Sequence, residues 1–289
     1  MRNLLLIGLA ASLPSCVADE GTDDVSATEQ LVSGWAAGTW GTTTDLAGAD
    51  TGWSGDTSTC VMSALRGNLS EGGYWQDLDE PSVGFVRVDP SNGHYFMRAH
   101  GGAFETDGQR VWTNNPVLVG TVCVPYVSTG SPIWSSKQST VAPPLKLAGL
   151  ATNRRCFLQG VQGGEGLFTN YADYVRVRKL TSVDATHPST GWYLESNLVS
   201  TANNQPALAI ATCVDFPTIS AEWGGAFGGA TYSMTTGTGV KMCGLTGVYG
   251  AYTANSWTDG VALDPPSTQN GNWTMTVSAN KYAEANCIQ

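Results

Sequence analysis

Three copies of one eight-residue segment, each beginning with a cysteine, limit how this chain can fold more than any other feature. The segments are CVMSALRG at 60–67, CFLQGVQG at 156–163 and CGLTGVYG at 243–250. The second and third agree in residue type at six of eight positions, and the first is a looser copy. Self-similarity of this kind indicates repeated supersecondary units. We therefore expect three related units.

The residues around each octapeptide also recur in a constant order. A tryptophan precedes the octapeptide, and an alternating apolar pair follows it. An aromatic residue two positions before Met or Leu comes next, and a second cysteine closes the unit. These markers are Trp40, Val86, Val88, Tyr95, Met97 and Cys123 in the first unit, Trp134, Val175, Val177, Trp192, Leu194 and Cys213 in the second, and Trp223, Val261, Leu263, Trp273, Met275 and Cys287 in the third.

The apolar residues of these segments alternate as they do in β-strands. The stretch ALAIATCV (207–214) places Leu, Ile, Thr and Val on one face and Ala and Cys on the other. The chain has 35 glycines and only 13% charged residues, which fits a turn-rich β protein. We predict an all-β fold with four or more strands in each unit, and an aromatic residue of each unit (Tyr95, Trp192, Trp273) in the core.

The cysteines indicate one disulfide in each unit. Seven are present, and six remain after Cys16 is assigned to the leader segment. Six cysteines allow many pairings, but the threefold repetition selects one of them. We predict Cys60–Cys123, Cys156–Cys213 and Cys243–Cys287, each stabilising the fold by roughly 3 to 4 kcal/mol.

The glycine that ends each octapeptide is expected to serve the backbone. Gly67, Gly163 and Gly250 stand where a bulge or tight turn would need a positive φ. No lysine or helix pattern follows them, which argues against a phosphate-binding loop.

Two arrangements of the units remain open. The three could form one pseudo-threefold body, such as a β-trefoil or β-prism, or they could be small sandwiches in a row. Short connections favour the single body. We place the units at 34–130, 131–218 and 219–289.

The first residues read as an export signal. Arg2 precedes a short apolar run, and Leu13, Ser15 and Cys16 follow. This segment resembles the lipobox of bacterial lipoproteins, which implies a signal peptide at 1–15 and a lipidated Cys16. An ordinary secretory signal is the alternative. Residues 16–33 contain five acidic and no basic residues, so we expect a flexible tether and a protein that is exported and anchored to a membrane.

Charge and missing motifs exclude several functions. Without 1–15 the chain has 13 basic and 24 acidic residues, a net charge of 13 − 24 = −11, so nucleic acid is not an expected partner. G-x-S-x-G, H-E-x-x-H, the P-loop and Cys-x-x-Cys are absent, and the three histidines do not recur between units. We expect no metal or cofactor and assign no catalytic residue.

One polar pattern does recur. An aromatic residue stands two positions before an aspartate about fifteen residues after each first cysteine: Trp75 and Asp77, Tyr171 and Asp173, Trp257 and Asp259. A ring can stack on a sugar while a carboxylate accepts from its hydroxyl groups. Alternatively, the ring closes one end of the core and the aspartate caps a turn.

The octapeptides resemble repeats in secreted bacterial proteins to which no activity is assigned, so the resemblance implies export and a β-repeat fold only. The leading hypothesis is a surface protein that binds a glycan or another surface polymer through the aromatic–aspartate pairs. A structural envelope protein without a small ligand and an extracellular hydrolase are the alternatives.

Overall fold

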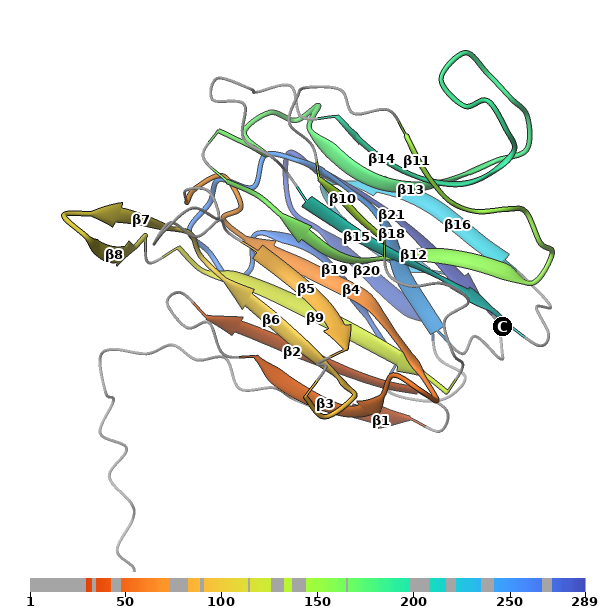
Figure 1. Cartoon of the computed structure of the whole chain (residues 1–289), viewed down its shortest axis with the longest axis horizontal. Coiled ribbons are helices and arrows are strands. Elements are labelled where there is room, and N and C mark those ends of the chain that lie inside the picture. Colours follow the sequence, from red (N-terminus) through yellow and green to blue (C-terminus); the bar gives the residue numbers. More distant parts are fainter. Residues whose placement is uncertain are drawn as a thin grey trace, which may run out of the picture.

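The computed structural model describes most of the chain from Gln30 onward and contains strands but no helix in the described residues (Figure 1). The described residues are 30–32, 35–42, 48–72, 83–88, 91–113, 115–125, 133–136, 144–164, 166–197, 208–216, 222–234, 242–266 and 272–288. Within these ranges no segment forms a helix that is long and apolar enough to cross a bilayer. The predicted all-β class is confirmed. Cys16 and the proposed signal peptide lie outside the described residues.

Each unit contributes six strands that correspond in order. In the first unit they are β2 (Trp35–Thr42), β3 (Ala49–Ser54), β4 (Thr59–Gly67), β5 (Val83–Val88), β6 (His94–His100) and β9 (Val117–Val124). In the second they are β10 (Ile133–Ser136), β11 (Leu145–Ala148), β12 (Arg154–Gln162), β13 (Tyr174–Leu180), β14 (Gly191–Asn197) and β15 (Leu208–Asp215). In the third they are β16 (Glu222–Gly228), β17 (Thr231–Met234), β18 (Met242–Gly250), β19 (Gly260–Asp264), β20 (Trp273–Val277) and β21 (Lys281–Ile288).

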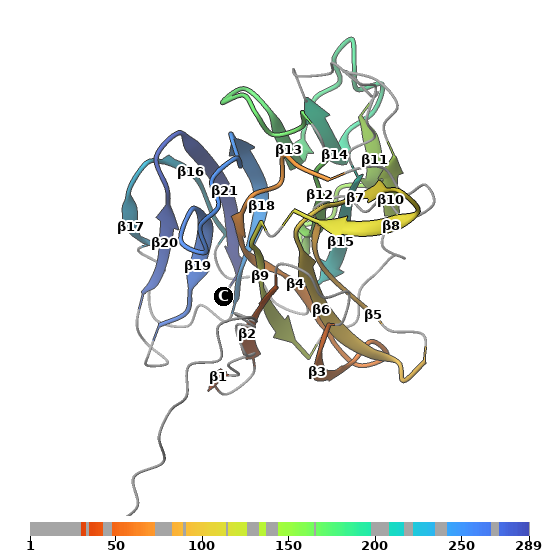
Figure 2. The same cartoon turned by 90° about the vertical axis from the view of Figure 1, so that its left-hand side faces the viewer.

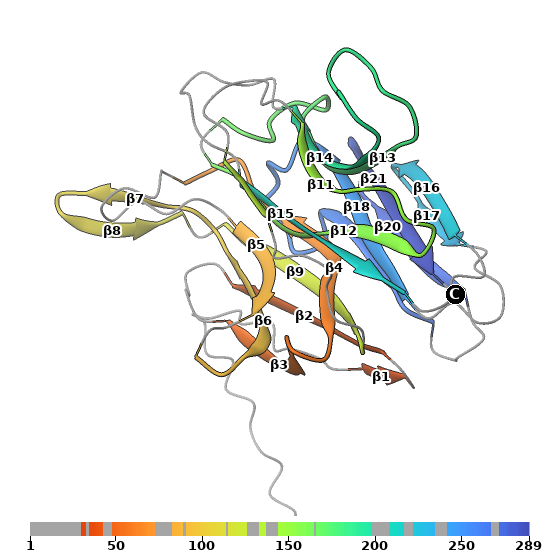
Figure 3. The same cartoon turned by 45° about the vertical axis from the view of Figure 1, so that its right-hand side comes forward.

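The first unit has three further strands. β1 (Gln30–Val32) pairs with β2. β7 (Ala103–Thr106) and β8 (Gln109–Trp112) form a separate hairpin that projects from the body (Figure 3). Asp107 and Gly108 at its tip have φ of 53° and 73°, as a two-residue hairpin turn requires.

The units exchange strands, so every large sheet is built from two of them. The three sheets have the orders β1-β2-β9-β4-β19-β20-β17, β10-β15-β12-β5-β6-β3 and β11-β14-β13-β18-β21-β16. Each sheet therefore joins the octapeptide strand of one unit and its neighbours to three strands of another unit. The three octapeptide strands β4, β12 and β18 lie together in the middle of the molecule (Figure 2). The three sheets are open, so a closed trefoil or prism is not confirmed.

The octapeptides form the joints between units. Their sixth residues pair across the joint in the same register: Leu65 with Val261, Val161 with Gly84, and Val248 with Val175. In the first unit the apolar pair is displaced, because Gly84, and not Val86, occupies the place of Val175 and Val261. Val86 instead pairs with Met97, as Val177 pairs with Leu194.

A β-bulge interrupts all three octapeptides at their fourth position. The register shifts between Met62 and Ala64, between Leu158 and Gly160, and between Leu245 and Gly247. A bulge bends a strand and increases its twist. The repeated bulge therefore gives each central strand the same bend before it meets the neighbouring unit.

The second octapeptide position explains one departure from the pattern. Val61 and Phe157 are buried in the main core, whereas the third copy has Gly244. A Cβ on Gly244 would lie 2.7 Å from Cδ1 of Phe157 and 2.8 Å from Cγ2 of Val61. The second positions of the three octapeptides thus share one volume, and the glycine of the third copy leaves room for the phenylalanine of the second.

Backbone hydrogen bonds also join the three units beyond the octapeptides. Leu69 N–H donates to Tyr252 O, Tyr252 N–H donates to Phe168 O, and Gly164 N–H donates to Leu69 O. The side chains of Leu69, Phe168 and Tyr252 are buried. One large buried side chain from each unit therefore packs where these hydrogen bonds join the three units.

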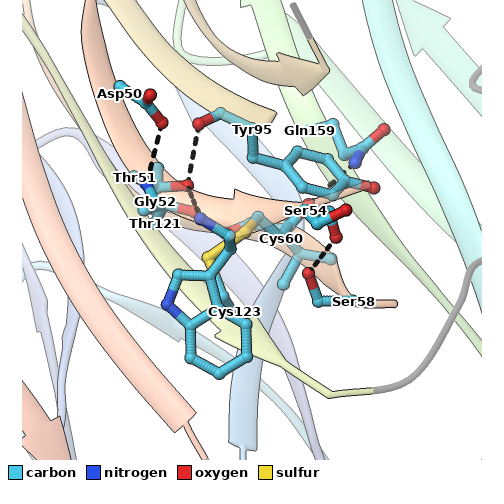
Figure 4. Close-up of a disulfide and its surroundings, with 12 residues drawn as sticks. Asp50, Thr51, Gly52, Ser54, Ser58, Cys60, Tyr95, Thr121, Cys123 and Gln159 are labelled. Atoms are coloured by element: carbon cyan, nitrogen blue, oxygen red, sulfur yellow. Dashed lines mark hydrogen bonds between the residues drawn. A yellow bond between two sulfur atoms is a disulfide. The ribbon is translucent and has the colours of Figure 1, made fainter. Parts of the chain in front are cut away.

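The three predicted disulfides are confirmed. Cys60–Cys123, Cys156–Cys213 and Cys243–Cys287 each join residues directly opposite one another on neighbouring strands. Figure 4 shows the first bridge, beside which Gln159 Nε2 donates to Cys60 O at 2.7 Å. The bridges lie within units, and contacts such as this one connect units.

Other expectations are partly confirmed. Tyr95, Trp192 and Trp273 are buried as predicted. Gly67 and Gly250 have φ of 99° and 109°, but Gly163 is not among the positive-φ residues. A Cβ on Gly163 would overlap the carbonyl oxygen of Leu69, so there the glycine is needed for close approach of two backbones.

Candidate functional site

The first predicted aromatic–aspartate pair, Trp75 and Asp77, lies outside the described residues. The other two pairs are described. Tyr171 is 80% exposed, which suits a contact with a ligand. Asp173 is fully buried, and its Oδ2 accepts from the backbone N–H of Thr169 at 3.1 Å and of Asn170 at 3.0 Å. The geometry of Asp173 therefore favours the turn-capping alternative.

The third pair is also occupied within the fold. Trp257 is partly buried and packs against Ala64, Leu118 and Ala262. Asp259 Oδ2 accepts from Lys281 Nζ at 2.6 Å, and the lysine side chain is 2% exposed. The carboxylate thus balances a buried ammonium group, as a buried charge requires.

The second and third pairs stand at the same place in their units. Asp173 directly precedes β13 and Asp259 directly precedes β19. Their carbonyl groups accept from Gly250 N–H and Gly67 N–H, each at 2.8 Å. Asp77 stands six positions before Val83, the start of β5 (83 − 77 = 6). It is therefore not equivalent to the other two aspartates in sequence register, and ligand binding by these pairs stays a prediction.

A different site appears when the three joints are compared on the sheet faces turned away from the main core. In the sheet of β4 and β19 this face has the apolar cluster of Ala64, Leu118 and Ala262 under Trp257. In the sheet of β12 and β5 it has an apolar cluster with these members: Val83, Phe85 and Ile210, packed by Phe96.

The third joint, between β18 and β13, is polar and aromatic. Its outer face consists of Tyr174, Arg176, Glu195, Tyr249, Tyr282 and Glu284, which we call the tyrosine face. Arg176 stands at the position of Phe85 and Ala262 in the other sheets. Glu284 likewise stands at the position of Ile210. Since the same scaffold accepts apolar residues at these two positions, packing does not require the charges of Arg176 and Glu284.

The rings of the tyrosine face touch one another. Tyr249 lies 5.1 Å from Tyr174 and 5.3 Å from Tyr282, measured between ring centroids. Cζ of Arg176 lies 4.9 Å from the Tyr174 ring, within the range of a cation–π contact. Tyr282 is 40% exposed. The cluster therefore presents aromatic surface to solvent on a rigid sheet.

The polar groups of this face are held by hydrogen bonds. Arg176 Nε donates to Glu195 Oε2 at 2.6 Å, and the Tyr249 hydroxyl donates to Glu284 Oε1 at 2.5 Å. Burial raises the pKa of Tyr249, and the charge of Glu284 raises it further. Burial lowers the pKa of Arg176, but Tyr249 and Glu195 outweigh it, and the pKa is raised overall. The face thus carries a neutral phenol, a permanent cation and two carboxyl groups.

A loop between β13 and β14 adds a histidine to the face. His187 Nε2 lies 2.8 Å from Glu195 Oε1, and its Nδ1 lies 2.8 Å from Asp184 Oδ1. Hydrogen bonds from His187 and then Thr186 lower the pKa of Asp184. Four strands and one loop thereby contribute to one connected set of polar groups.

No protein-family model matches this chain, and no curated protein sequence is significantly similar to it.

Sequence analysis did not find the tyrosine face. Its residues come from β13, β14, β18 and β21, and the sheet order alone brings them together. One signal was present: the seventh octapeptide residue is Tyr249 in the third copy but Arg66 and Gln162 in the others. In the described residues no three His, Cys, Asp or Glu side chains form a group that could hold a metal ion.

Proposed function

We propose that this is an exported, disulfide-stapled β-repeat protein that binds carbohydrate through the tyrosine face. The observation that carries the proposal is the difference between the three joints. Two joints have an apolar cluster on the outer face, beside polar residues such as Arg66 and Gln162. The third has clustered tyrosines, and it has Arg176 and Glu284 where the second has Phe85 and Ile210. A function other than packing explains why these polar residues are present.

The chemistry of the face suits a sugar. A tyrosine ring offers a flat apolar surface to the C–H face of a pyranose, and fixed polar groups orient its hydroxyl groups. Arg176 can donate, and Glu284 can accept. Because the proposed site lies on one face of an open sheet, we expect weak binding, about millimolar or roughly 4 kcal/mol.

The remaining features extend the proposal to location and shape. Three disulfides are consistent with export to an oxidising compartment. Lipidation of Cys16 would anchor the protein to a membrane, with the acidic segment between Cys16 and β1 as its tether. The expected tether bound of 33 is too long, because Gln30–Val32 pair with β2. The cyclic exchange of strands supports a pseudo-threefold, β-prism-like body in place of three separate sandwiches.

A glycan array followed by calorimetric titration of any sugar that binds tests the proposal. Tyr282→Ala removes an exposed ring of the tyrosine face, and we expect it to weaken binding about tenfold, or roughly 1.4 kcal/mol. Tyr171→Ala removes an exposed ring of the aromatic–aspartate pair and is the matched control. Loss of binding in Tyr171→Ala alone would move the site to that pair. An array without any bound sugar would favour the structural envelope protein.

A further inference from the structure

His187 occupies an unusual position between two carboxyl groups. Its side chain is 5% exposed, and both ring nitrogens lie 2.8 Å from a carboxylate oxygen, of Asp184 and of Glu195. An imidazole donates from both nitrogens only when it is protonated. The observed arrangement therefore suits the imidazolium ion.

Glu195 is shared between this histidine and the arginine of the tyrosine face. Its Oε1 faces His187, and its Oε2 accepts from Arg176 Nε at 2.6 Å. Arg178 Nη1 lies 3.9 Å from Oε1. Three titratable groups contact His187 directly: Asp184 in the loop, and Glu195 and Tyr193 on β14. Arg176 and Arg178 on β13 act on it through Glu195. Lys146 on β11 donates to Ser189 of the same loop.

Deprotonation of His187 changes this balance. The Thr186 hydroxyl lies 2.8 Å from Nδ1 and can donate to it, so a neutral ring can keep its Nε2–H bond to Glu195. One positive charge is nevertheless lost beside Glu195. The carboxylate then attracts the arginines more strongly, because two charges a few ångströms apart interact appreciably where water is largely excluded.

We propose that His187 is a positioning residue that controls, through Glu195, how freely Arg176 donates to a ligand, so that binding at the tyrosine face strengthens as the pH falls. This inference rests on the proposed function. Histidines titrate between about pH 5 and 8, the range in which the effect belongs. In the imidazolium form Glu195 divides its attraction between two cations, and in the neutral form it holds Arg176 more tightly.

Affinity measured against pH gives the first test. For a sugar that binds, the wild-type protein is expected to bind about fivefold more tightly at pH 5.5 than at pH 7.5, a typical size for coupling between two sites. His187→Gln keeps a donor but cannot become charged, so its affinity is expected to be independent of pH. His94→Gln is the matched control, because His94 is partly exposed on β6 and pairs with Asp50. An unchanged pH profile in His187→Gln overturns the proposal.

A second readout needs no ligand. The ¹⁵N chemical shift of Arg176 Nε, assigned through Arg176→Lys, is expected to move with pH at the midpoint of the His187 ring signals. If no sugar binds but this shift is observed, the coupling stands and the proposed function fails. If Arg176 Nε does not respond to His187, the coupling itself is wrong.

Discussion

Cys60 and Cys123 stand opposite each other on adjacent strands, although 63 residues separate them and the intervening β5 and β6 belong to a different sheet. The bridge therefore closes a loop of chain that leaves its own sheet, pairs with a second unit and returns. The same relationship holds for Cys156 with Cys213 and for Cys243 with Cys287. Each disulfide therefore lowers the conformational entropy of the unfolded chain by linking the two ends of the segment that carries the exchanged pair of strands.

Removing one bridge should therefore cost stability without changing the sheet order. For the double variant Cys243→Ala with Cys287→Ala, whose cysteines are 44 residues apart, chain entropy predicts a loss of about 4 kcal/mol. Denaturant unfolding measures it. A loss below about 1 kcal/mol would contradict the expectation that the bridge stabilises the protein by restricting the unfolded chain.

Gly244→Ala should destabilise the protein by about 1 to 3 kcal/mol, because its methyl group would press on Phe157 and Val61 in a core that has no room for it. Gly149→Ala is the control, since nothing lies within 4 Å of a Cβ there. The midpoints of denaturant unfolding give both values. Equal stability of the two variants would contradict the convergence of three units at this point.

Asp173→Ala should cost about 1 to 3 kcal/mol in the free energy of unfolding, because the backbone N–H groups of Thr169 and Asn170 lose a charged acceptor. Tyr171→Ala should change the same quantity by less than about 0.5 kcal/mol, since its ring is exposed. Thermal and denaturant unfolding compare the two. Should Asp173→Ala keep full stability but lose sugar binding, its carboxylate is a ligand and not a turn cap.

Acid should weaken the loop that carries Asp184. The pKa of Asp184 is lowered in the folded state, chiefly by His187 and Thr186, so its contribution is present above the pKa of the unfolded chain, near 4. That contribution is lost as the pH falls towards the lower folded value. The melting temperature of Asp184→Asn should therefore decline less than that of the wild type between pH 4 and pH 2. Parallel curves would disprove a role of this carboxylate.

Cys16 should be the acylated first residue of the mature protein, as its place after Leu13 and Ser15 predicts. Mass spectrometry of the membrane fraction is the measurement. A soluble mature form that begins after Cys16 would replace the lipid anchor with an ordinary secretory signal.

The three disulfides could be predicted because each follows from repetition alone. The second cysteine of every unit lies at a matching place, so no knowledge of the sheets was needed to pair Cys156 with Cys213. The buried aromatic residues Tyr95, Trp192 and Trp273 were likewise visible as period-2 alternation, which is a local property of a strand. The displacement of the apolar pair in the first unit could not be predicted. Val86 and Val88 show the expected alternation, whereas Gly84 and Val86 occupy the equivalent positions in the sheet.

The exchange of strands could not be inferred from the chain. An antiparallel edge offers the same backbone hydrogen bonds to any strand of suitable length, so Val83–Val88 reads the same whether it pairs within its unit or with β12. The meeting of Val61, Phe157 and Gly244 in one space is a property of the three units together, and no single unit contains it. The sequence thus sufficed for the strands, the repeat and the bridges. The joints between units follow from long-range packing, which a local sequence pattern does not predict. The same packing brings Arg176, Tyr249 and Glu284 together.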